Sequence, residues 1–170
     1  METESLDTTR LLLPIHDEDH VHGPASADFT LVEYGDYECP DCGRLFQIIR
    51  DLQATLGSRL QIVYRHYPLN GIHPEAQEAA EAAEAAGGQN RFWEMHDLLY
   101  ENQDLWKDDI NPKTIFLKFA ADLGLETARF ARDMDDKQVK LRIEADQEVA
   151  AELGINSTPT VLIDGRQLRP

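Results

Sequence analysis

The sequence lacks any apolar run long enough to span a membrane, and it is short of basic residues. Its 170 residues hold 16 lysine and arginine side chains against 32 aspartate and glutamate side chains, a formal net charge of −16 at pH 7. Nucleic acid and anionic membrane surfaces are therefore poor partners, and direct membrane insertion is not expected. Residues 1–10 also lack the basic start and apolar core of a secretory signal. We expect a cytoplasmic protein, or a periplasmic one if a signal has been removed.

Cysteine is equally scarce, with only Cys39 and Cys42 in the chain. A zinc site normally needs two more cysteine or histidine ligands at close spacing, and no second pair exists. A structural disulfide is also disfavoured, because a three-residue spacing closes too short a loop to stabilise much. The pair therefore favours a redox-active C-x-x-C motif, with a zinc half-site as the competing interpretation.

The residues around this motif place it where a strand turns into a helix. Residues 29–35 have strand character, and apolar side chains follow at helical spacing: Leu45, Ile48, Ile49, Leu52 and Leu56. Both cysteines then fall in the first helical turn, where unpaired N–H groups and the positive end of the helix dipole converge. This environment favours a thiolate at Cys39, the species that attacks disulfides. Pro40 suits a first turn because no N–H is needed there.

The chain divides into four predicted parts. Residues 1–28 form a lead, whose apolar cluster at 11–15 packs on the domain or pairs as an edge strand. Residues 29–73 form a β-α-β half with a parallel crossover. Residues 74–154 form a helical insertion, and 155–170 form a proline loop and a β-hairpin.

Finer expectations concern the insertion, the hairpin and the lead. Helices are predicted at about 75–86, 92–99, 112–123, 127–134 and 137–153. The last helix should bury one stripe: Leu141, Ala145, Val149 and Leu153. Asp164-Gly165 predicts a hairpin turn of type I′ character. The histidine-rich segment 16–22 could suggest a metal site, but nothing regular fixes its side chains, so we expect a solvated loop and no metal.

These residues resemble the DsbA-like branch of the thioredoxin superfamily, and within it the domains found free-standing or fused to sodium/proton antiporters. The similar segments are 31–43, 65–69, 73–74, 92–97 and 158–160, and the resemblance covers about residues 11–168. It implies an α/β thioredoxin-like fold with a helical sub-domain inserted between the β-α-β and β-β halves. Two departures are the acid Asp41, where the strong oxidant of the family has histidine, and the absence before Pro170 of the family's final helix.

The resemblance also implies roles for individual residues. In the family the proline matching Pro159 is cis, and the backbone of the preceding residue, here Thr158, pairs with an extended substrate peptide. Pro40 and Asp41 complete the expected substrate-binding set. An acidic residue under the motif matches Glu33, which would be buried with a raised pKa and placed to move the proton of Cys42. Without the resemblance, Pro159 is equally a trans proline that starts a strand, and Glu33 an outward-facing strand residue.

The resulting hypothesis is a thiol–disulfide oxidoreductase that needs no cofactor. Cys39 attacks a disulfide of a protein, a peptide or glutathione, and Cys42 resolves the mixed disulfide with help from Glu33. The main alternative is a redox-sensing or regulatory module acting on a partner such as a membrane transporter. Weaker alternatives are the related isomerase and glutathione-transferase branch and a zinc-binding module. The sequence identifies no partner reductase or oxidase.

Overall fold

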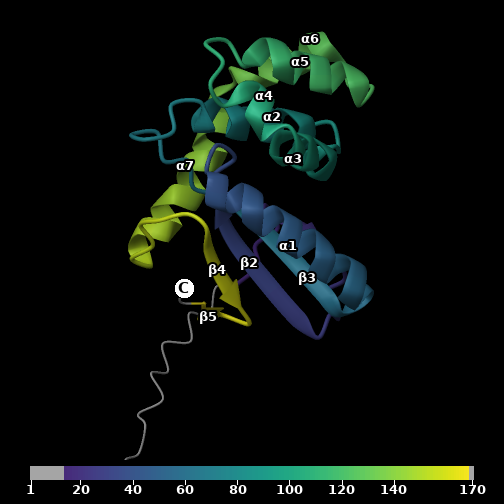
Figure 1. Ribbon diagram of the computed structural model, residues 1–170, viewed down its shortest axis with the longest axis vertical. Coiled ribbons are helices and arrows are strands. Elements are labelled where there is room, and N and C mark those ends of the chain that lie inside the picture. Colours follow the sequence, from purple (N-terminus) through teal and green to yellow (C-terminus); the bar gives the residue numbers. More distant parts are fainter. Residues whose placement is uncertain (1–13, 169–170) are drawn as a thin grey trace, which may run out of the picture.

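The computed structural model describes residues 14–168, in which a five-stranded sheet is combined with helices (Figure 1). The first part of the predicted lead, with most of its apolar cluster, lies outside the described residues. The strands are β1 (His20–His22), β2 (Phe29–Gly35), β3 (Leu60–His66), β4 (Thr160–Ile163) and β5 (Arg166–Gln167). They lie in the order β1-β3-β2-β4-β5, with β2 and β3 parallel and the other pairs antiparallel. The predicted parallel crossover is confirmed.

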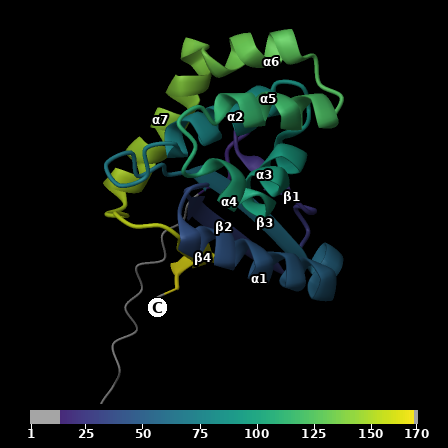
Figure 2. The ribbon, with the colours of Figure 1, turned by 45° about the horizontal axis from the view of Figure 1, so that its top comes forward.

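The helices form a group beyond one end of the sheet and two covering layers. They are α1 (Pro40–Leu56), the short 3-10 turn η1 (Gly57–Arg59), α2 (Ala76–Gly87), α3 (Phe92–Glu101), α4 (Gln103–Trp106), α5 (Lys113–Asp122), α6 (Thr127–Met134) and α7 (Lys137–Glu152). In Figures 1 and 2, α2 to α6 gather beyond the sheet, α1 lies along it, and α7 runs from the helical group toward the sheet. Over the described residues, no helix combines the length and apolarity needed to cross a membrane. The mixed α/β thioredoxin-like architecture is the predicted one.

Alternate residues of β2 supply two apolar cores because side chains of a strand point to opposite faces. Leu31 packs with Ile49 of α1 on one face. Val32 and Tyr34 pack with Ala150 of α7 on the other. A third cluster joins α1 to the helical group and contains both cysteines. The start of α1 is therefore packed from the sheet and from the helices together.

Two predicted buried faces are wrong in detail. In α1 the buried residues are Cys42, Phe46 and Ile49, whereas Ile48 is 56% exposed. Helical spacing alone does not predict the exposure of Ile48, because α1 also packs on the helical group, which turns its buried face toward Cys42 and Phe46. Ile48 is left at the surface.

The second wrong face is that of α7. It buries Ile143, Asp146 and Ala150, while Leu141 is 42% exposed. Asp146 can occupy the packed face because its carboxylate accepts from the backbone N–H of His66 at 2.8 Å, and from Arg142 on the same helix.

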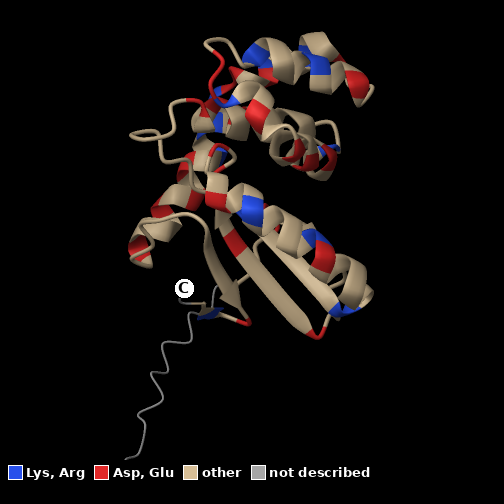
Figure 3. Cartoon of the chain, viewed as in Figure 1, with Lys and Arg blue, Asp and Glu red and all other residues tan. Residues whose placement is uncertain are grey.

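The predicted loop at residues 16–22 is also partly wrong. His20 to His22 form β1, an edge strand that pairs antiparallel with β3. By contrast, the turn at Asp164-Gly165 is confirmed: φ is 48° at Asp164 and 78° at Gly165, as a type I′ turn requires. Acidic residues are spread over both the helical group and the covering helices, with basic residues interspersed (Figure 3).

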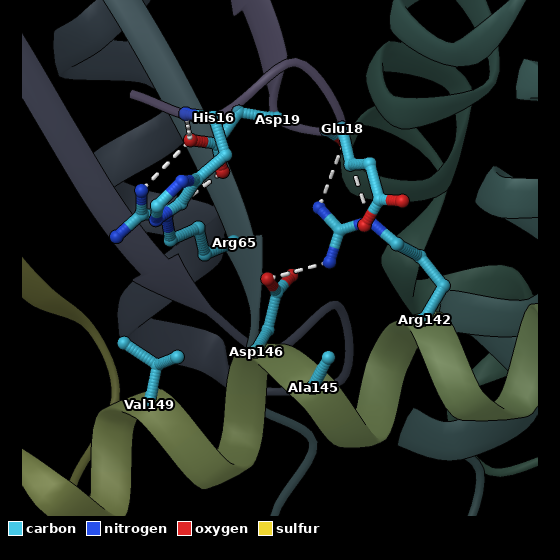
Figure 4. A pocket seen from close by; sticks show the side chains of 8 residues that line it. All are labelled: His16, Glu18, Asp19, Arg65, Arg142, Ala145, Asp146 and Val149. Carbon is cyan, nitrogen blue, oxygen red and sulfur yellow. Dashed lines mark hydrogen bonds and ion pairs between the residues drawn. The ribbon is translucent and has the colours of Figure 1, made fainter. Parts of the chain in front are cut away.

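A buried ionic network attaches the described start of the chain to the sheet (Figure 4). Arg65 donates to both carboxylate oxygens of Asp19, at 2.9 and 2.7 Å, and to the hydroxyl of Tyr34 at 3.0 Å. Arg142 donates to the backbone carbonyl of Glu18 at 3.0 Å and to Asp146 at 2.6 Å. A cavity of about 90 Å³ is lined by the charged residues of this network together with His16, Ala145 and Val149. Both guanidinium groups are engaged, so we interpret the cavity as part of a structural clamp.

We expect Arg65→Ala to lower the free energy of unfolding by about 3–5 kcal/mol, because it leaves the Asp19 carboxylate buried without its partner. The two side chains are only 2% and 3% exposed. Urea unfolding measures the loss. Arg59→Ala is the matched control: the Arg59–Asp28 pair is 59% and 54% exposed, and its removal should cost less than about 1 kcal/mol. Equal losses would contradict the clamp.

Candidate active site

The turn between β2 and α1 is fixed by one buried carboxylate. Asp36 is 1% exposed and accepts three hydrogen bonds: from the N–H of Glu38 at 2.8 Å, from the N–H of Leu69 at 2.9 Å and from Nδ1 of His73 at 2.7 Å. These bonds tie the residues before Cys39 to the loop after β3. The turn is therefore held in place by residues that are distant from it in the sequence.

Gln103 holds the same turn from the helical group. Its side-chain amide donates to the carbonyls of Tyr37 at 2.6 Å and Cys39 at 3.0 Å. It begins α4, directly after α3. The sequence analysis missed Gln103, since nothing in its local pattern relates it to a motif 61 residues earlier. Gly43 makes room for it, because a Cβ there would lie 3.0 Å from the Gln103 side-chain oxygen.

The two cysteines are adjacent but differ in depth. Cys39 is the N-cap residue of α1 and is 5% exposed, whereas Cys42 is completely buried. They lie 3.7 Å apart and are not joined by a disulfide. The structure thus brings them together as a possible dithiol pair.

Their pKa values shift in opposite directions. The pKa of Cys39 is lowered to about 6, chiefly because the Cys42 thiol donates to the Cys39 sulfur. The backbone N–H of Cys42 and the side chain of Thr158 act in the same direction. Burial and the adjacent Cys39 raise the pKa of the Cys42 thiol far above its usual range. At neutral pH the proton therefore stays on Cys42 and Cys39 is a thiolate.

The loop before β4 lies against Cys39. The Thr158–Pro159 peptide bond is cis, and the Cys39 sulfur is 3.6 Å from the Thr158 carbonyl oxygen. The Thr158 hydroxyl is buried and has no hydrogen-bond partner among the described residues. Beside this contact a groove of about 560 Å³ runs along α1 and the final hairpin, lined by Asp41, Arg44, Leu45, Ile48, Ser157, Thr158, Pro159, Thr160, Val161, Gln167 and Leu168.

Of the two residues between the cysteines, Asp41 lines this groove and Pro40 does not. Both are exposed, and the Asp41 carboxylate pairs with Arg44 one turn along α1. The carboxylate that acts most strongly against the Cys39 thiolate is instead Asp36, whose negative charge raises the pKa of Cys39. The Cys39 thiolate is therefore repelled more by Asp36, which precedes the C-x-x-C motif, than by Asp41, which lies within it.

Glu33 lies on β2, in the layer beneath the motif. It is 3% exposed, and one of its carboxyl oxygens is buried with no hydrogen-bond partner. Burial and the Cys39 thiolate raise the pKa of Glu33 to about 8. A cavity of about 20 Å³ beside it, reaching Gln53, Trp93 and Asp97, has room for about one water molecule. The carboxyl is thus protonated at neutral pH and able to exchange that proton.

Gly35 is required by the closeness of this arrangement. A Cβ at position 35 would lie 2.5 Å from the ring of Tyr64 and 2.9 Å from the Glu33 carboxyl oxygen. Any larger residue would push Glu33 and Tyr64 out of place. This glycine therefore keeps the acid directly under the turn.

The comparisons with known proteins agree with this geometry. The family described as thioredoxin matches residues 16–170. The chain belongs to the thioredoxin superfamily, as a DsbA-like member. It is 28% identical to a thioredoxin-like oxidoreductase from Silicibacter pomeroyi, with a TM-score of 0.76 over 90% of this chain and 84% of that one. BdbD from Bacillus subtilis shares the fold, with a TM-score of 0.79, 21% identity, and 90% and 85% coverage.

A longer protein is also similar. The chain is 42% identical over 158 residues to the Na(+)/H(+) antiporter NhaA 1 of Salinispora arenicola, a match that covers 92% of this chain and 23% of that protein. The match to the Mycolicibacterium gilvum antiporter covers 94% and 26%. The chain thus spans about a quarter of the length of these relatives.

Three buried tyrosines pack in the interior of this DsbA-like site. Tyr37, Tyr64 and Tyr100 are buried, and burial raises the pKa of each phenol well above 10. The Tyr64 and Tyr100 hydroxyls lie 3.0 Å apart, and the Tyr37 and Tyr64 rings stack at 5.1 Å. They therefore stay neutral, and with them Glu33 and Cys42 lie in a buried region of low dielectric.

We expect the reduced protein to develop thiolate absorbance with a midpoint near pH 6. Cys42→Ala should raise this midpoint because it removes the thiol donor, whereas Cys42→Ser, which keeps an O–H donor, should raise it less. The ordinary thiol pKa is about 8.5, so the fold favours the thiolate. The free energy of unfolding of the reduced form, relative to that of the oxidised form, should therefore rise as the pH increases from 6 to about 8.5. This extra stability should be lost as the pH falls through 6. A wild-type midpoint near 8.5 would contradict the assignment.

Proposed function

We propose that this chain is a thiol–disulfide oxidoreductase with Cys39 as nucleophile and Cys42 as resolving thiol. The observation that carries the proposal is the pair of opposed pKa shifts at adjacent cysteines, one at the helix start and one buried behind it. A merely structural pair would gain nothing from this polarity. The oxidoreductase named among the similar structures supports the same reaction class.

In the first step the Cys39 thiolate attacks one sulfur of a substrate disulfide. The substrate S–S bond breaks, a mixed disulfide with Cys39 forms, and the departing substrate sulfur takes up a proton from solvent. The Thr158 side chain supports this step because it helps to lower the pKa of Cys39. The Thr158 carbonyl, 3.6 Å from the sulfur, is a hydrogen-bond acceptor and is free to pair with a substrate N–H. An extended peptide in the adjoining groove can use the backbone of the same loop.

In the second step Cys42 gives up its proton and attacks the Cys39 sulfur, which forms the Cys39–Cys42 disulfide and releases the substrate as a thiolate. Glu33 is the proposed acceptor of that proton. The Cys39 thiolate is one cause of the raised Glu33 pKa, and the mixed disulfide removes that charge. The pKa of Glu33 should then fall, so the carboxylate form becomes available when Cys42 must be deprotonated.

The proposal is tested by turnover of a disulfide peptide with reduced glutathione. Wild type should turn over repeatedly. With glutathione left out, Cys42→Ser should accumulate a mixed disulfide with the peptide, because Cys39 still attacks and no second thiol is present to resolve it, and Cys39→Ser should form none. Mass spectrometry identifies the trapped species. Equal trapping by the two variants would show that the roles are assigned wrongly.

A second candidate, a redox-regulatory module, is favoured by one observation. The chain matches about a quarter of antiporter relatives whose names describe Na(+)/H(+) exchange, which suggests a partner of transporter type. Such a module changes state once and then stops, whereas an oxidoreductase continues. One equivalent of peptide converted per protein, with glutathione in excess, would therefore favour the regulatory function.

We expect Glu33→Gln to slow the second step more than the first. The substitution keeps the shape of the side chain but removes the proton acceptor, and a general base contributes roughly 10²–10⁴-fold. Single-turnover kinetics separate formation of the mixed disulfide from its resolution. In wild type, resolution should accelerate with pH through an inflection below 8, and this inflection should vanish in Glu33→Gln. Equal slowing of both steps would assign Glu33 a structural role.

A further inference from the structure

Three side chains with metal-ligating atoms converge outside the cysteine site, between β1, β3 and α2. His20 Nε2 lies 2.6 Å from Glu84 Oε1, and His66 Nε2 lies 2.8 Å from the same oxygen. One ligand atom from each of the three residues lies within 4.8 Å of the other two. The residues come from three elements far apart in sequence, so the tertiary fold assembles the cluster.

Aromatic packing fixes both imidazole rings. The His20 ring stacks on Phe92, with centroids 3.4 Å apart and planes 2° from parallel. The His66 ring meets the rings of Phe92 and Tyr64 nearly edge-on, at 5.9 and 5.4 Å. The sequence of residues 16–22 gave no reason to expect fixed ligands. In the structure, the pairing of β1 with β3 holds His20 in place. Preorganised ligands are what a metal site requires.

We propose that His20, His66 and Glu84 bind a divalent transition-metal ion of the Zn²⁺ type. Two imidazoles and one carboxylate form a common ligand set for such ions. Metal–ligand bonds of about 2.0–2.2 Å put tetrahedral ligand atoms roughly 3.3–3.6 Å apart. The two nitrogens lie within 4.8 Å of each other, so they must approach by at most about 1.5 Å. The Glu84 oxygen, now 2.6 and 2.8 Å from them, must withdraw by about 0.5–1 Å.

Binding of the metal ion to the two Nε2 atoms needs no loss of protons from the site. In the metal-free arrangement each histidine donates its Nε2 hydrogen to Glu84, and on binding that hydrogen moves to Nδ1 of the same ring. His66 Nδ1 is buried without a partner, whether it carries a hydrogen or a lone pair, so binding adds no unpaired buried atom there. Glu84 neutralises one of the two positive charges.

The burial of the three residues suggests a structural site with one side open. The His66 side chain is 1% exposed, while those of Glu84 and His20 are 10% and 17% exposed. The remaining coordination position therefore faces the His20 and Glu84 side, where water can reach it. The ion would join the edge strand β1 to α2 and to the end of β3, so its main effect is on stability.

The experiment uses the full chain with Cys39 and Cys42 joined as a disulfide, so that no thiolate competes for the metal. Calorimetric titration with Zn²⁺ should show one ion bound per chain. At a hundredfold excess over Kd, the Tm should rise by about 5–10 °C. Co²⁺ as a spectroscopic probe should give the visible bands of a tetrahedral nitrogen and oxygen site, without sulfur-to-metal charge transfer.

The variants separate this site from others. His20→Ala and the isosteric Glu84→Gln should each abolish the Tm shift. His22→Ala is the matched control: it lies on the same strand, and its ring contacts Trp93, which is not one of the three ligands. It should leave the shift intact. No Zn²⁺-dependent shift, or a shift that persists in both His20→Ala and Glu84→Gln, would mean that the three residues form a hydrogen-bonded triad only.

Discussion

The pairing of β2 with a strand on each side fixes the relative positions of the two segments that form the candidate site. β3 pairs with β2 along its whole length, and β4 pairs with residues 31–34 from the other edge. Both segments of the candidate site depend on this one strand: Cys39 lies four residues beyond its end, and Thr158 lies just before β4. Their separation is therefore set by sheet hydrogen bonds. The bonds to Asp36 and from Gln103 extend this rigidity into the turn.

The opposed pKa shifts of the two cysteines follow from this rigidity. Cys39 reaches hydrogen-bond donors at the start of α1, while Cys42, one turn deeper, lies among apolar and neutral aromatic side chains. A negative charge is stabilised at the first position and penalised at the second. A looser turn would average the two environments, and the polarity that the proposed mechanism uses would be lost. Both residues are cysteines, so their different depths and hydrogen-bond partners distinguish the two thiols.

Local sequence predicts the parts of the fold that local physics determines. The central strands, the strand-to-helix position of the motif, α6 and the hairpin turn follow from periodicity and turn chemistry. Residues whose position depends on a distant partner were missed. Asp146 was not part of the predicted buried stripe of α7, because a charged residue on a packed face is favourable only with the His66 N–H and Arg142 beside it. Gln103 and β1 escaped prediction for the same reason, since each acts on a segment far away in sequence.

The carboxylates near Cys39 illustrate how dependence on distant partners limits what the sequence can say about function. From the sequence, Asp41 is the obvious acid to act against a thiolate at Cys39, because it stands between the cysteines. In the folded chain Asp41 is exposed and paired with Arg44, so solvent and the guanidinium screen it. Asp36 is buried, where screening is weak, and its charge works against the net lowering of the Cys39 pKa. The same carboxylate accepts from His73. The thiolate is thus tuned from the loop after β3 as well as from the motif, and swapping the two residues between the cysteines would alter only the screened part of its environment.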